Sequence, residues 1–314
     1  MQTRFVSPYF LSPRFLALAG TVVLWASAFP AIRVAVDGLG LAALSLLRLA
    51  IAAVALVAVA PFARVRMPRR RDLPQIALCG LTGMTAYQVL LNWGEIHVEA
   101  GTASLLIAVA PVFSILLGSA FLTEPLTRNV VAGSVIALAG TAVVTLAGGV
   151  SGFTAASLVV LAAAVVQGVY HTASKPLLRR YTGLEVATYA MAAGTVFALP
   201  LAPATFRTVG DAPAGALLAV AFLGLLPSAL GFVIWGYAVA RLPLAASTAA
   251  LYLVPPVALL VAFVWLGEVP HAVELLGGAV VVAGVVLINH RRRRPPAGTG
   301  AHAHRDADLT SVHP

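Results

Sequence analysis

The amino-acid sequence predicts an all-α integral membrane protein with ten transmembrane helices in two inverted five-helix repeats. Three observations predict this fold: a low charge content, a series of long apolar runs and an internal repeat. Of the 314 residues, 60% are hydrophobic and 10% are charged, whereas soluble domains carry about 25% charged residues. This composition favours lipid as the surrounding solvent.

The apolar runs define the predicted spans, since a membrane-spanning helix needs about 20 mostly apolar residues. One charge-free run, 129–174, is too long for a single span and is divided at the turn signal Gly148-Gly149-Val150-Ser151-Gly152. The predicted spans are 15–36, 39–62, 73–94, 100–122, 128–147, 155–173, 184–204, 213–239, 244–265 and 272–290.

The distribution of Lys and Arg predicts the orientation. The net charge of +9 would also suit nucleic acid, but the cations form short clusters between apolar runs, which is typical of cytoplasmic loops. With the N-terminus inside, 17 of the 20 Lys and Arg residues fall on the cytoplasmic side. Arg207 falls in an outside loop, and Arg33 and Arg48 lie within spans. We therefore expect a multi-pass protein of the cytoplasmic membrane with both termini cytoplasmic and no nucleic-acid partner.

The chain ends lie outside the predicted bundle. Residues 1–14 form a cytoplasmic segment, and the basic, Pro/Gly/Ala/His-rich residues 291–314 predict a disordered cytoplasmic tail. His302 and His304 in this tail would make only a weak metal site, so no metal is expected. A signal peptide is the alternative for the first span, but its removal would leave nine spans and break the repeat.

The internal repeat relates residues 99–144 to 243–288 without a gap, at an offset of 144. The matched pairs are Pro111 with Pro255, Glu124 with Glu268, Gly133 with Gly277 and Gly140 with Gly284. The predicted domains are a first repeat (15–147), a linker (148–154) and a second repeat (155–290). Five helices are an odd number, so the second half would enter the membrane from the opposite side. Inverted repeats are typical of secondary transporters, and duplication of a purely structural bundle is the alternative.

Several motifs resemble the drug/metabolite transporter superfamily, specifically EamA-type permeases with ten transmembrane helices. They are Leu24-Trp25-Ala26-Ser27 with Phe29 and Arg33, Leu46-Leu47-Arg48-Leu49, Ala100 to Pro111, Leu122-Thr123-Glu124 with Gly133 and Gly140, Ala245 to Pro255, and Leu266-Gly267-Glu268 with Gly277 and Gly284. The resemblance covers roughly residues 15–290 and implies transport of amino acids or other metabolites, without identifying the substrate.

Candidate binding residues are the polar, aromatic and proline residues that interrupt the apolar spans. Buried amides are costly unless partnered, and matched breaks in two halves point to the binding site of a transporter. We expect a central cavity lined by spans one, three, four, six, eight and nine. The candidates are Trp25, Arg48, Tyr87, Gln88, Asn92, Pro111, Gln167, Tyr170, Tyr252 and Pro255.

Some candidates have a structural alternative. Arg48 could contact an anionic group of the substrate, such as a carboxylate, or be an anchor bonded to carbonyls or the head-group region. The prolines could form kinks used only for packing. Trp235 near a span end suggests an aromatic belt, and His171 suggests a solvated histidine near the cytoplasmic end of its span.

Other residues are predicted to be structural. Glu124 and Glu268 would cap the N-termini of spans five and ten. The glycines, which are Gly133, Gly140, Gly277 and Gly284, would form small-residue stripes for close helix contact.

No phosphate-binding, metalloprotease or nucleophile-elbow motif indicates an enzyme. We expect a secondary transporter that exports amino acids or related compounds by alternating access and needs no cofactor. The alternative is a flippase or membrane enzyme acting on lipid-linked substrates. The expected partners are a small-molecule substrate and the lipid bilayer, while a coupling ion and a homodimer are left open.

Overall fold

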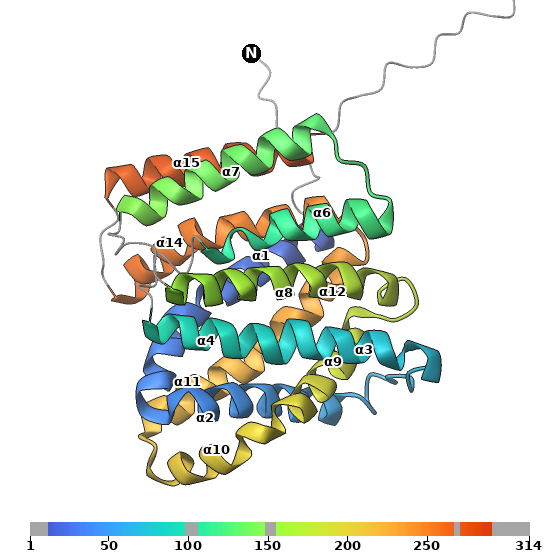
Figure 1. Ribbon diagram of the computed structural model, residues 1–314, viewed down its shortest axis with the longest axis vertical. Coiled ribbons are helices and arrows are strands. Elements are labelled where there is room, and N and C mark those ends of the chain that lie inside the picture. Colours follow the sequence, from blue (N-terminus) through green and yellow to red (C-terminus); the bar gives the residue numbers. More distant parts are fainter. Residues whose placement is uncertain (1–11, 98–105, 148–154, 267–270, 291–314) are drawn as a thin grey trace, which may run out of the picture.

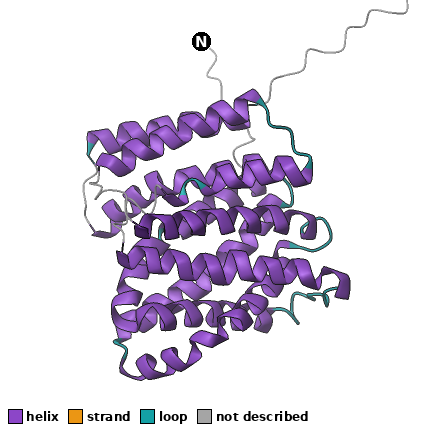
Figure 2. Ribbon diagram, in the orientation of Figure 1, coloured by secondary structure: helices purple, strands orange, loops and turns teal. Residues whose placement is uncertain are grey.

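A computed structural model of the chain describes residues 12–97, 106–147, 155–266 and 271–290. These residues form helices and loops, and no strand occurs among them (Figure 2). Most helices lie side by side along one direction, from the α7–α15 pair at one end of the stack to α10 at the other (Figure 1). Within these described ranges, five helical segments are long and apolar enough to cross a membrane, and three shorter apolar helices accompany them. The prediction of an all-α membrane protein is confirmed.

Several predicted features lie outside the described residues. They are Glu268, the linker 148–154, most of segment 1–14 and the tail 291–314 with His302 and His304.

The first half contains a helix that is broken at a glycine. Its helices are α1 (Pro13–Ala26), α2 (Ala28–Val59), α3 (Leu73–Cys79), α4 (Tyr87–His97), α6 (Ala110–Leu122) and α7 (Arg128–Ala147). Within α2, Gly40 has φ 71° and ψ 172°, a conformation that glycine adopts without the steric cost of a side chain. The chain therefore turns at Gly40, which lies at the start of the predicted second span (39–62).

The second half contains the helices α8 (Ala155–Leu177), α9 (Gly183–Ala198), α10 (Ala202–Thr208), α11 (Ala214–Leu223), α12 (Gly231–Val239), α13 (Leu244–Ala249), α14 (Val254–Leu266) and α15 (Ala272–Asn289). A reciprocal capping box begins α9: the Thr182 side chain accepts from the backbone N–H of Glu185, and the Glu185 side chain accepts from that of Thr182. This pattern satisfies two donors that a helix start otherwise leaves unbonded.

Irregular segments recur at the offset of the sequence repeat. A π-helix, Gly80–Ala86, joins α3 to α4, and a second, Gly224–Leu230, joins α11 to α12. Their first residues are 144 apart (224 − 80), as are those of α6 and α14 (254 − 110). Each of these last two helices follows an interruption, at turn residues 108–109 before Pro111 and at the 3-10 helix Ala250–Leu253 before Pro255. Spans four and nine are therefore broken beside the matched prolines, as the sequence predicts.

The helices α7 and α15 pack closely along their glycines. A Cβ atom added to Gly140 would lie 2.6 Å from the backbone N of Val281, and one added to Gly284 would lie 2.6 Å from the carbonyl oxygen of Gly133. The predicted small-residue stripes thus face each other, and no side chain fits between the two backbones.

We predict that Gly140→Leu destabilises the protein by about 1–3 kcal/mol or more, because the new side chain must push α7 away from α15. The matched control is Gly215→Leu, since a Cβ at Gly215 meets no atom within 4 Å. Folded yield and melting temperature in detergent measure the effect. Equal values for the two variants would show that the close contact does not hold the pair together.

Candidate functional site

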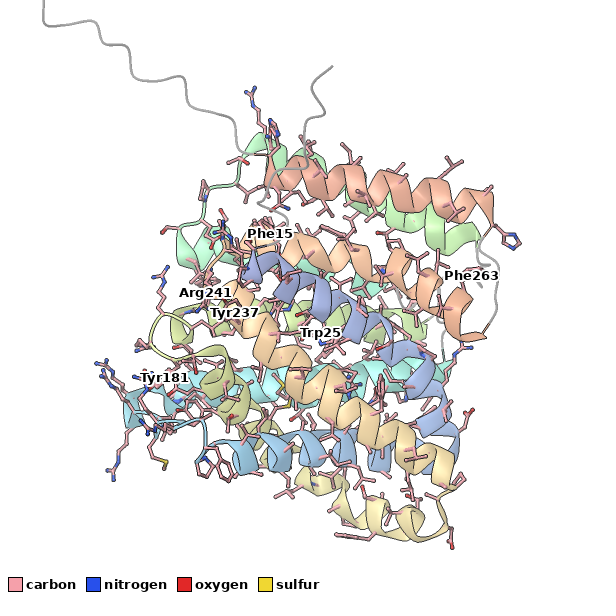
Figure 3. All side chains as sticks on the ribbon, turned by 180° about the vertical axis from the view of Figure 1, so that it is seen from behind. Phe15, Trp25, Tyr181, Tyr237, Arg241 and Phe263 are labelled. Atoms are coloured by element: carbon pink, nitrogen blue, oxygen red, sulfur yellow. The ribbon has the colours of Figure 1, made fainter. Side chains whose placement is uncertain are left out.

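A cavity of about 60 Å³ lies in the middle of the bundle, with walls from both halves. Residues of all six spans that the sequence assigned to a central cavity contribute to its wall, and the second span adds Arg48. Five of the ten candidate binding residues line it: Trp25, Arg48, Tyr87, Gln167 and Pro255. Trp25 lies midway between the two edges of the molecule in Figure 3.

The cavity is small for a metabolite. Small-molecule pockets typically measure about 300–1,000 Å³, and one water molecule needs about 10–15 Å³ of such space. A volume of about 60 Å³ therefore holds a few water molecules. Binding of a metabolite requires the surrounding helices to move apart.

Arg48 is the only charged residue among the described residues that line the cavity. Its side chain is 4% exposed, and its Nε donates to the Ser228 hydroxyl at 2.8 Å. Ser228 lies in the second π-helix, so this hydrogen bond joins the two halves. Arg48 is enclosed by protein, which suits contact with a substrate or a role as an internal anchor.

Two buried amides lie on α4, the helix that carries the lining residues Tyr87 and Leu91. Gln88 is fully buried, and neither end of its amide has a hydrogen-bond partner within the described structure. Asn92 donates to the Ser45 hydroxyl at 3.0 Å, while its Oδ1 has no partner there. An unsatisfied buried amide costs about 1–3 kcal/mol, so these groups are available to a polar ligand or to water.

A hydrogen-bonded chain runs from the cavity wall across the two halves. Gln167 Nε2 lies 3.3 Å from His171 Nε2, His171 Nδ1 lies 2.9 Å from Ser114 Oγ, and Ser114 donates to the carbonyl of Ala110 at 2.9 Å. These hydrogen bonds are compatible with one another when a neutral His171 carries its proton on Nδ1, accepts from Gln167 and donates to Ser114. It links α8 to the first turn of α6, where Pro111 lies.

His171 and Trp235 differ from the sequence-based expectations. His171 is fully buried rather than solvated, and Trp235 is fully buried rather than part of an aromatic belt. Trp235 has its ring centroid 5.4 Å from Trp25 and 5.0 Å from His171, while Trp25 lies 5.1 Å from Phe232. Hydropathy places a residue along a helix but does not say which face is buried, so both predictions are wrong.

The remaining candidates pack behind the cavity wall. Pro111 is buried in the first turn of α6. Tyr170 lies against the backbone of the first π-helix at Gly83, and its ring meets Phe232 edge-on at 5.6 Å. Tyr252 is fully buried in a core cluster that includes Ala137 of α7 and Val281 of α15. Their positions support the cavity wall without reaching the space itself.

Glu124 does not cap its own span as the sequence predicts. The helix α7 begins later, at Arg128, and Glu124 instead accepts from the backbone N–H of Leu244 at 2.9 Å, at the start of α13 in the other half. Lys175 donates to the carbonyls of Val239 and Leu242, which flank the α12–α13 connection. The carboxylate of Glu124 therefore holds this connection to the end of α6, and the ammonium group of Lys175 holds it to α8.

A second polar network joins the two halves on the side of the molecule where Glu124 and Lys175 make their contacts. We call Asp72, Arg180 and Tyr181, with Arg66 and Glu185, the edge network. Asp72 pairs with Arg180 at 2.8 Å and accepts from the Tyr181 hydroxyl at 2.7 Å. Arg66 pairs with Glu185 at 2.7 Å, and this hydrogen bond raises the pKa of Arg66, a loop residue, above its ordinary value. Sequence analysis missed these pairs, because the partners are 108 (180 − 72) and 119 (185 − 66) residues apart.

Residues 13–146 and 154–290 each match the EamA-like transporter family. The chain belongs to this family. This EamA-like transporter is 64% identical over 293 residues, 92% of its own chain and 99% of the relative, to the "Probable terminal-alkyne amino-acid exporter" of Streptantibioticus cattleyicolor. It is 36% identical over 265 residues, 83% of its own chain and 86% of the relative, to the "Uncharacterized transporter YdfC" of Bacillus subtilis.

More distant proteins extend the comparison. The "Pseudopaline exporter CntI" of Pseudomonas aeruginosa is 25% identical over 232 residues, which cover 71% of this chain and 78% of that protein. One crystal structure matches with a TM-score of 0.69 at 22% identity, over 87% of this chain and 95% of the other. The chain is therefore a membrane transporter, and its fold is shared with a protein of distant sequence.

We predict that Gln88→Leu lowers transport by about tenfold, the effect of losing one hydrogen bond to the substrate. The melting temperature should not fall, since Gln88 loses no hydrogen bond within the described protein. Gln167→Leu should lower both flux and melting temperature, because it also breaks the link to His171. Flux per folded molecule and thermal unfolding separate the two effects. Undiminished flux in both variants would contradict the assignment of these amides to the site.

Proposed function

We propose that this transporter exports an amino acid across the cytoplasmic membrane by alternating access between two inverted five-helix halves. The observation that carries the proposal is a central cavity whose walls come from both halves and whose charged lining residue is Arg48. Rocking of one half against the other would expose such a space to each side in turn.

The recurrence of irregular elements supports the inverted repeat of ten spans. The π-helices and the proline breaks recur at an offset of 144 residues. In the bounds proposed from sequence, 15–147 and 155–290, each half contains five spans. An odd number reverses the direction of the second half, so its equivalent elements would face the cavity from the opposite side.

The cavity chemistry suits an amino acid. A carboxylate would pair with the guanidinium of Arg48 in a charge-assisted hydrogen bond. The aromatic wall of Trp25, Phe29 and Phe232 would receive an apolar side chain, and the free Oε1 of Gln167 would accept from the ammonium group. The name of the relative from Streptantibioticus cattleyicolor supports a terminal-alkyne amino acid as cargo. The slender apolar side chain of such an amino acid also matches this aromatic wall.

The cations support an orientation with both termini in the cytoplasm. Tyr181, Arg241, Tyr237 and Phe15 lie toward one side of the molecule, and Phe263 lies toward the opposite side (Figure 3). The edge network and the contacts of Glu124 and Lys175 belong to the former side. In this orientation they close the cytoplasmic side and would have to open when substrate enters from the cytoplasm.

Efflux from proteoliposomes tests the proposed activity. Vesicles preloaded with a terminal-alkyne amino acid should release it faster than protein-free vesicles, whereas release of its decarboxylated amine should not depend on the protein because the amine lacks the group that Arg48 would bind. Arg48→Gln should lower flux on the order of 10- to 100-fold, the loss of a charged hydrogen bond, and Arg48→Lys should retain more.

The same assay separates the alternatives. Repeating it with and without proton and sodium gradients would identify a coupling ion. Absence of flux for every amino acid, together with turnover of a lipid-linked substrate, would favour a flippase or an enzyme instead.

Cys79 offers an internal test of opening at the cytoplasmic side. The thiol is fully buried at the end of α3, the helix that follows Asp72. We predict that Asp72→Asn increases the rate of maleimide labelling of Cys79 several-fold, because it removes the ion pair with Arg180. Arg180→Gln should give the same increase, and the double variant should add little, since both changes remove one interaction.

Asp211→Asn is the matched control, because Asp211 is exposed and outside the edge network. Labelling is compared below the melting temperature of each variant, so that unfolding does not contribute. If the rates of all variants equal that of the unchanged protein, the edge network does not hold the cytoplasmic side closed.

A further inference from the structure

A second, larger cavity opens at the edge of the molecule, separate from the central one. Its volume is about 1240 Å³. Its walls come from the start of α1, the α6–α7 and α12–α13 connections, and the end of α15. We call it the edge cavity. It is formed where α7 and α15 leave the rest of the bundle, at the level where the helices end.

The edge cavity is strongly basic. Among the described residues, its lining carries the cations Arg14, Arg128, Lys175 and Arg241 but only one carboxylate, Glu124. That carboxylate is engaged with the backbone of α13. Arg14, Arg128 and Arg241 have no acidic partner in the part of the chain that the structure describes. The lining residues that the structure describes therefore carry a clear excess of positive charge.

The rest of the lining mixes apolar residues with threonine, asparagine and histidine side chains. Its apolar residues include Phe15 of α1, Val130 of α7, Ala245 of α13 and Ile288 of α15. Phe15 and Arg241 lie at the same edge of the molecule (Figure 3), and the Arg241 guanidinium lies 3.7 Å from the centre of the Tyr237 ring. A cavity that carries both cations and apolar side chains matches an amphiphile with an anionic head.

We propose that the edge cavity binds an anionic phospholipid, with the phosphate at the arginines and the acyl chains along the apolar lining residues. Basic pockets between membrane helices on the cytoplasmic side are suited to acidic head groups. The inference uses the proposed orientation, which sets this edge at the inner leaflet. A lipid here would contact the α6–α7 and α12–α13 connections together, beside the site where Glu124 joins the two halves.

Native mass spectrometry of the full chain in detergent, titrated with phosphatidylglycerol or phosphatidylcholine, tests the binding. The unchanged protein should retain phosphatidylglycerol preferentially. Arg14→Gln with Arg128→Gln should weaken this binding roughly 30-fold, the effect expected for two charges near a lipid phosphate. Neither side chain makes an ion pair in the described structure, so the variant should fold.

The matched control is Arg64→Gln with Arg70→Gln, which removes two exposed cations of the same edge outside the cavity. Equal weakening in both double variants, or equal retention of phosphatidylcholine, would overturn the proposal. Displacement of the lipid by millimolar inorganic phosphate would assign the site to a free anion instead. Binding is measured without flux, so failure here leaves the export proposal intact, and failure of export leaves this result intact.

Discussion

Lipid offers no hydrogen-bond partner to a backbone, so every interruption of a spanning helix has to be satisfied by protein or face a cavity. This constraint organises the molecule. The π-helix Gly224–Leu230 contains Pro227, which cannot donate, and the Pro227 carbonyl accepts from Trp25 Nε1 at 3.0 Å. The same segment carries Ser228, the partner of Arg48. The breaks beside Pro111 and Pro255 line or support the same central space. The irregular segments of the backbone are thus the segments that line or support the central cavity.

The two halves share backbone geometry but not chemistry. At the offset of 144 residues, Arg48 corresponds to Ala192 and Gln88 to Phe232. Among the described lining residues of the central cavity, the first half supplies the charged Arg48 and the second half supplies no charged side chain, although the helices around the cavity repeat. A symmetric scaffold allows two related conformations, whereas an asymmetric lining can hold a substrate with a charged end and an apolar end.

The sequence predicted most of the scaffold because apolar runs, glycines and prolines act locally. The break at Pro111, the glycine contact at Gly140 and half of the cavity candidates follow from such local signals. The sequence did not predict which side of a helix is buried, as Trp235 and His171 show. It also did not predict that Glu124 would bond to α13, because that choice depends on tertiary contacts between segments 120 residues apart (244 − 124).

The helix α12 connects the cavity to the edge through successive contacts. Phe232 lines the cavity beside Trp25, Trp235 packs one turn further on against His171, and the carbonyl of Val239 at its end binds Lys175. His171 and Lys175 both belong to α8, so α8 and α12 are joined at the centre and at the edge. Widening the cavity by separating Phe232 from Trp25 would pull on the same helix that Lys175 holds. In the proposed mechanism, α12 would therefore link substrate binding to opening of the edge.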